Sequence, residues 1–151
     1  MGNLQAYWVH GTAVQIEREG YFVTKQRAGF GAIFRTHGAE WFHFAIPTPV
    51  IVDGTRSSLK KVFVLFKTEG TAKITNIHVY DGNAKIAAFD NIARDGDHST
   101  VIDKDNSWLV APSPEIKFGL GISVNVNFGP PTKLGVPAIM FVTAGADFET
   151  P

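Results

Sequence analysis

The chain has 151 residues, of which 44% are hydrophobic and 19% are charged, and this composition indicates neither a disordered chain nor a membrane-spanning one. Its 14 basic and 14 acidic side chains balance, so it has no net field to attract nucleic acid or anionic lipid. It contains no cysteine, which excludes disulfides, thiolate nucleophiles and zinc–thiolate sites. We therefore expect no nucleic-acid or membrane partner, and the neutral net charge favours a homo-oligomer.

The N-terminal segment has neither the basic region nor the apolar core of a signal peptide. No apolar run approaches the ~20 residues that a membrane-spanning helix needs. A chain of this length can build one hydrophobic core without cross-links. We expect a single domain over residues 1–151, located in the cytoplasm and needing no cofactor.

Alternating apolar and polar residues, interrupted by Gly, Pro, Asn and Asp, predict β-strands along the whole chain. In chain order, strands are expected at residues 4–10, 13–17, 21–25, 31–36, 41–46, 50–52, 61–68, 72–80, 85–90, 100–102, 108–110, 118–128 and 137–148. The sequence has no long window with helical periodicity, and at most a short helical turn is expected near residues 57–60 or 92–95.

The segment 118–128 shows most clearly how the strands should pack. One face of it is apolar and the other is small or polar, which is typical of a strand with one side on a core. The apolar face comprises Phe118, Leu120, Ile122, Val124, Val126 and Phe128, and the other face comprises Gly119, Gly121, Ser123, Asn125 and Asn127. Many short strands of this kind predict an all-β fold, an antiparallel β-sandwich that is jelly-roll-like, with a closed β-barrel as second choice.

Three histidines lie within predicted strands, in mainly apolar company: His10, His43 and His78. A metal site built from them would have to be assembled by the fold, because the chain has no HxH or HExxH motif. A pocket histidine could instead act as the acid–base group of a cofactor-free isomerase, cyclase or dehydratase. The remaining alternative is that each ring only bonds to neighbouring backbone or hydroxyl groups.

Aromatic residues make up 12% of the chain, and core packing accounts for most of the Phe residues. A ligand pocket or a subunit interface could hold some of the other rings, because Trp and Tyr combine a broad apolar face with a polar tip. The preferred function is noncatalytic binding of a carbohydrate or a small apolar molecule, in the manner of a lectin. The expected ligand contacts are Trp8, His10, Trp41, Asn76 and Trp108. If the protein is an enzyme, the expected catalytic residues are His43, His78 and Tyr80. A structural or assembly protein without a site is the third alternative.

Two further polar patterns bear on function. The acidic loops at residues 90–106 offer Asp103, Asp105 and Asn91 as oxygen ligands for Ca²⁺, although the spacing is not that of an EF-hand and such residues are ordinary in turns. The polar stripe of Ser123, Asn125 and Asn127 both donates and accepts hydrogen bonds, as a polyol ligand requires. A serine nucleophile has little support, because no Gly-x-Ser-x-Gly turn is present.

Overall fold

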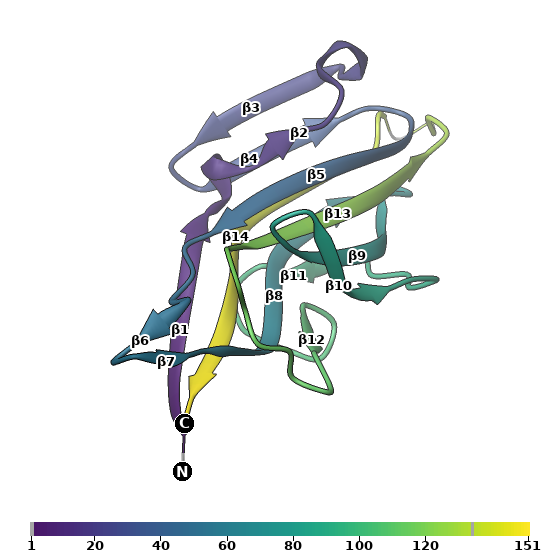
Figure 1. Ribbon diagram of the computed structural model, residues 1–151. Helices are drawn as coiled ribbons and strands as arrows, with labels where there is room; N and C mark the ends of the chain where they lie inside the picture. The colour runs from purple at the N-terminus through teal and green to yellow at the C-terminus, as the bar shows by residue number, and fades with distance from the viewer. Residues whose placement is uncertain (1, 134) are drawn as a thin grey trace.

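The computed structural model describes residues 2–133 and 135–151 and consists almost entirely of antiparallel strands (Figure 1). The strands are β1 Asn3–His10, β2 Gln15–Ile16, β3 Thr24–Ala28, β4 Gly31–Arg35, β5 Gly38–Ile46, β6 Ile51–Val52, β7 Thr55–Arg56, β8 Ser58–Glu69, β9 Lys73–Asp81, β10 Ala84–Phe89, β11 Asp97–His98, β12 Ser107–Leu109, β13 Leu120–Gly129 and β14 Ala138–Thr150. Two short 3₁₀ turns, η1 at Gly11–Ala13 and η2 at Glu19–Tyr21, flank β2. No helix in the described part of the chain is long and apolar enough to cross a membrane.

The strands form two packed sheets and a small hairpin of β6 and β7. Sheet A has the order β11-β8-β14-β4-β3, with β1 also paired to β14 and β12 also paired to β8. Sheet B has the order β10-β9-β13-β5-β2. Figure 1 shows β13 running between β5 and β9, and β1 beside β14 at the end where both chain termini lie.

The connections between the sheets are those of a jelly roll. The chain crosses from β4 in sheet A to β5 in sheet B, back to β8, and again to β9. The last two long strands are inserted between earlier ones, β13 between β5 and β9 and β14 between β4 and β8. This nested order confirms the predicted jelly-roll sandwich. The second choice, a closed barrel, is wrong because both sheets end in edge strands.

Phenylalanine rings fill the space between the two sheets. The ring of Phe42 in sheet B lies 5.0 Å from those of Phe34 and Phe141 in sheet A, measured between centroids. The largest fully buried side chains are Phe34, Phe42, Phe44, Phe66, Phe128, Phe141, Phe148, Leu59, Ile74, Ile77, Ile116 and Ile122. Because side chains alternate between the two faces of each strand, these residues all point into one shared core. Burial of their apolar surface is the main favourable term in folding.

Strand β13 alternates as expected, with one exception at its start. Leu120, Ile122, Val124, Val126 and Phe128 are buried, which confirms the inward face. Phe118 is instead 78% exposed and precedes the strand, because its backbone N–H is held by the carboxylate of Asp81. The prediction that Phe118 belongs to the core face is therefore wrong.

Four short elements also differ from the sequence-based prediction. Residues 57–60 do not form a helical turn, because β8 begins at Ser58. Residues 92–95 do not form one either, since Arg94 pairs with Ile74 in an isolated bridge. Residues 100–102 form a bend rather than a strand, with Val101 65% exposed. The predicted strand at 13–17 shrinks to the two residues of β2, because the η1 turn precedes it.

The edge strands of the sandwich differ in length and charge. In sheet A, β3 carries Lys25 and Arg27, while β11 and β12 at the other edge are two and three residues long. In sheet B, β2 has two residues, whereas β10 has six, with Lys85 as its one charged residue. Sheet A also ends in β1, an eight-residue strand that pairs with β14 alone in the described sheets and carries no Lys, Arg, Asp or Glu. Short or charged edges discourage pairing with other strands, so β1 and β10 are the most open edges.

Candidate functional site

The outer face of sheet B brings two of the predicted histidines together. The pairing register places Ser123 of β13 directly between His43 of β5 and His78 of β9. All three side chains point away from the core because their neighbours in each strand are buried. This row is the centre of the candidate site.

His43 links a hydroxyl and a carboxylate. Its Nδ1 atom lies 2.8 Å from Ser123 Oγ, and its Nε2 atom lies 3.0 Å from Glu17 Oε1. A carboxylate can only accept, so Nε2 carries the ring proton in the neutral imidazole. Nδ1 then presents a lone pair and accepts the hydroxyl proton of Ser123. Glu17 follows β2, where its backbone N–H donates to the carbonyl of Trp41 and so fixes its position.

His78 belongs to a second hydrogen-bond network on the same face. Its Nε2 atom lies 2.7 Å from Asp90 Oδ1, which also accepts a bond from Asn76 Nδ2 at 2.7 Å. These bonds, led by that from Asn76, hold the pKa of the Asp90 carboxyl below its ordinary value. Asn125 Nδ2 extends the network by donating to Asn76 Oδ1 at 3.0 Å. Asp90 therefore fixes Asn76 and His78 in defined orientations.

Two aromatic residues border these polar groups. The Trp41 ring lies 5.0 Å from the His78 ring between centroids, and Tyr80 occupies the next row of β9. The cross-strand partner of Tyr80 is Gly121, which has no side chain to fill the surface. The result is a groove of about 400 Å³ lined by Gln15, His43, Phe44, Ala45, Tyr80, Gly82, Gly121, Ile122 and Ser123.

An adjoining hollow of about 150 Å³ is lined by Glu17, Trp41, His43, His78, Tyr80 and Ser123. It shares three lining residues with the groove, namely His43, Tyr80 and Ser123. The two hollows together form a shallow polar and aromatic depression on sheet B. Four of the residues predicted from the sequence line this surface, namely His43, His78, Tyr80 and Trp41. A fifth, Asn76, bonds to the Asp90 carboxylate that also holds His78.

Three other predicted residues lie elsewhere. The ring nitrogens of His10 lie 2.9 Å from the Thr12 hydroxyl and from the Gly29 carbonyl, so its bonds are those of the structural alternative. The Trp8 ring stacks on Phe63 of sheet A at 4.9 Å between centroids. Trp108 is only 5% exposed and belongs to the core. His10, Trp8 and Trp108 do not line the depression on sheet B.

Sequence reasoning missed three contributors to the site. Glu17 and Asp90 supply the carboxylates that orient the histidines, and Gly121 leaves room for the groove. Glu17 and Asp90 follow the ends of short strands, where acidic residues are ordinary and give no distinct signal. Gly121 could have been noticed, because a glycine inside a strand often marks a place where another group comes close.

The acidic loops form a separate cluster. The ligand atoms of His98, Asp103 and Asp105 lie within 4.8 Å of one another, and this is the one group with metal-ligand spacing among the described residues. Asp103 already accepts bonds from His98 and from the backbone N–H groups of Asp105 and Asn106. Burial opposes a charged imidazole, but the bond to Asp103 outweighs it and raises the pKa of His98. Two of the three predicted Ca²⁺ ligands, Asp103 and Asp105, belong to this cluster.

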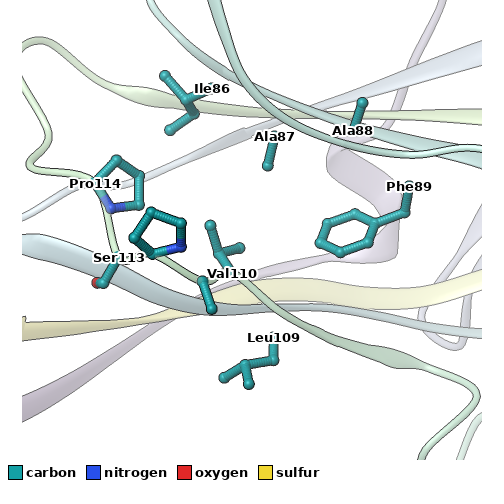
Figure 2. A pocket seen from close by; sticks show the side chains of 10 residues that line it. Ile86, Ala87, Ala88, Phe89, Leu109, Val110, Ser113 and Pro114 are labelled. Carbon is teal, nitrogen blue, oxygen red and sulfur yellow. The ribbon is translucent and has the colours of Figure 1, made fainter.

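An apolar cleft of about 380 Å³ opens between β10 and the segment after β12 (Figure 2). Figure 2 shows Ile86 and Phe89 on one side of this cleft and Val110 and Pro114 on the other. Leu109, which is 65% exposed, lies at its rim. The lining side chains offer a serine hydroxyl as their one polar group, and that hydroxyl bonds to the carbonyl of Leu59.

Comparison with known proteins identifies the family of the chain, but the function of that family is unknown. No curated protein matches the chain. A family model does match, over residues 3–148, and it describes a family of unknown function (DUF6623). The match spans almost all of both sheets and includes every residue of the depression on sheet B. The chain therefore belongs to the family of unknown function DUF6623.

Proposed function

We propose that the protein is a carbohydrate-binding jelly roll whose ligand lies in the depression on the outer face of sheet B. The observation that supports this is the convergence there of two aromatic rings with oriented hydrogen-bonding groups. A sugar presents apolar C–H faces and a ring of hydroxyls, so it needs both an aromatic surface and groups that donate and accept.

The polar groups suit the recognition of hydroxyls for two reasons. Their partners fix their orientation, and each still has an atom free to form a hydrogen bond with a ligand. His78 donates to Asp90 through Nε2, which leaves Nδ1 as an acceptor. Asp90 and Glu17 are 48% exposed and accept further bonds from ligand hydroxyls. Trp41 and Tyr80 are partly exposed and supply flat faces beside these groups. Jelly rolls include lectin domains, although the fold alone does not decide function.

The test is a glycan array followed by titration of any positive sugar, observed by NMR or calorimetry. We expect Trp41→Ala to weaken binding about tenfold, the effect of losing one aromatic contact of ~1.4 kcal/mol. Asn76→Ala should also weaken it, because it removes a donor and releases Asp90. Leu109→Ala is the matched control, since Leu109 lies at the apolar cleft and should leave the sugar affinity unchanged. No binding across the array would contradict the proposal.

The apolar cleft favours a second candidate, a small apolar ligand. Its volume of about 380 Å³ falls within the range of small-molecule pockets, and the side chains that line it are apolar apart from Ser113. A thermal-shift screen of apolar compounds tests this candidate. Leu109→Ala should then reduce the shift while Trp41→Ala does not, which separates the two candidates by the same pair of variants.

A further inference from the structure

We propose that Ser123, His43 and Glu17 form an acyl-transfer site, with Ser123 as nucleophile, His43 as general base and Glu17 as its orienting group. This activity goes beyond binding. Its substrate class, an O-acylated polyol, rests on the proposed function. The nucleophile, the base and the depression that would hold the ester are all on one face of sheet B.

The three side chains form the continuous hydrogen-bond chain that activates a serine. Ser123 Oγ lies 2.8 Å from His43 Nδ1, and His43 Nε2 lies 3.0 Å from Glu17 Oε1. Both distances are within the range required for proton transfer. The imidazole is used in the opposite sense to a chymotrypsin-type triad, with Nδ1 rather than Nε2 toward the serine. A triad is recognised by geometry and roles, and the Glu17 carboxylate selects the tautomer that leaves Nδ1 basic.

Ser123 lies where an ester carbonyl can approach it. Its side chain lines both hollows, and the residue as a whole is only 7% exposed, so water reaches it from one side. Its backbone pairs with β5 on one side and β9 on the other, so its N–H is not the donor for an oxyanion. We assign that role to the hydroxyl of Tyr80, which lines both hollows with Ser123.

The reaction balances with water as the only co-substrate. The Oγ atom of Ser123 bonds to the ester carbonyl carbon while its proton passes to His43 Nδ1, and the carbonyl electron pair moves onto oxygen. Collapse of this intermediate breaks the bond to the alcohol, which leaves with the proton from His43. Water then attacks the acyl-serine by the same route and releases the carboxylic acid and free Ser123.

The experiment treats the full chain with a fluorophosphonate probe and measures p-nitrophenyl acetate hydrolysis in parallel. We expect peptide mass mapping to find the probe on Ser123, and Ser123→Ala to abolish both labelling and hydrolysis. His43→Gln should lower the labelling rate by about a hundredfold or more, the usual contribution of a general base. Ser58→Ala and His37→Gln are the matched controls, because these residues lie in β8 and in the exposed turn between β4 and β5.

Glu17 is a positioning residue and needs a separate readout. Glu17→Gln should lower hydrolysis and change its pH profile, because an amide no longer fixes the His43 tautomer, while Glu17→Asp should restore part of the rate. Absence of probe on Ser123, or equal labelling of the His43→Gln variant, would overturn the proposal. Sugar binding by the unmodified protein tests the proposed function without any need for hydrolysis, so the two proposals can fail separately.

Discussion

The indole ring of Trp8 lies against the backbone of Gly145, its cross-strand partner in β14. A Cβ atom on Gly145 would lie 2.4 Å from Cδ2 of Trp8, closer than any ordinary contact. The same indole stacks on Phe63 of β8, which pairs with Gly145 from the other side. A glycine is therefore required here by close approach, and the contact gives Trp8 a structural role on sheet A.

Gly145→Ala should consequently destabilise the protein by about 1–3 kcal/mol, the usual cost of forcing an extra methyl into a packed position. Chemical denaturation measures the change in the free energy of unfolding. The combined Trp8→Ala and Gly145→Ala variant should lose less than the sum of the two single variants, because removing the indole makes room for the methyl. Additive losses would show that the clash is relieved in some other way.

Gly121→Val should close the groove on sheet B without unfolding the protein. A Cβ atom on Gly121 meets only the Phe44 carbonyl oxygen at 3.9 Å and Tyr80 Cβ at 4.0 Å, both ordinary contacts. Valine also favours strands, so the melting temperature should be equal or higher. Ligand binding should fall sharply because the branched side chain occupies the groove floor. Unchanged binding with an intact fold would place the ligand elsewhere.

Asp81→Asn should destabilise the protein by about 2 kcal/mol at neutral pH. Burial opposes the charged form of Asp81, but the backbone N–H groups of Lys117, Phe118 and Gly119 outweigh it and lower the pKa. A lowered pKa means that the stabilisation is present above the unfolded value of about 3.9 and is lost as pH falls through the folded value. The wild type and the variant should therefore converge in stability below about pH 4, as followed by denaturation at several pH values.

Asp147→Asn should have the opposite effect and stabilise the protein at neutral pH. Burial raises the pKa of Asp147, and the nearby Lys61 only partly compensates. A raised carboxyl pKa means that ionisation above the folded value costs stability, and the amide removes that cost. The gain should disappear at low pH, where Asp147 is protonated in both states. A loss of stability at pH 7 would indicate that the attraction to Lys61 outweighs the cost of burial.

Alternation in the sequence was enough to predict the sandwich and the orientation of its long strands. It correctly directed Ile122 and Val124 inward and Ser123 and Asn125 to the outer side of β13. Two short strands, β7 and β11, were missed, because they have two residues each and exist only through pairing with neighbours. Two residues are too few for periodicity to distinguish a strand from a turn.

The candidate site was only partly predictable, because its parts meet through long-range pairing. His43 and Ser123 are 80 residues apart, and their contact depends on β13 being inserted beside β5. The sequence pattern also misled at Trp108, which follows a polar loop and was therefore expected at a contact surface. Strand β12 turns that side chain inward onto the core, where it is 5% exposed. Burial of this kind depends on which sheet a short strand joins.

The unequal edges of the sandwich limit how copies of this chain can assemble by strand pairing. Strands β2, β11 and β12 are too short to template a new strand, and the cations of β3 repel another copy of the same edge. The edges of the two sheets that remain open to a partner strand are β10 and the eight-residue β1. Pairing of strands between copies is therefore confined to one edge of each sheet.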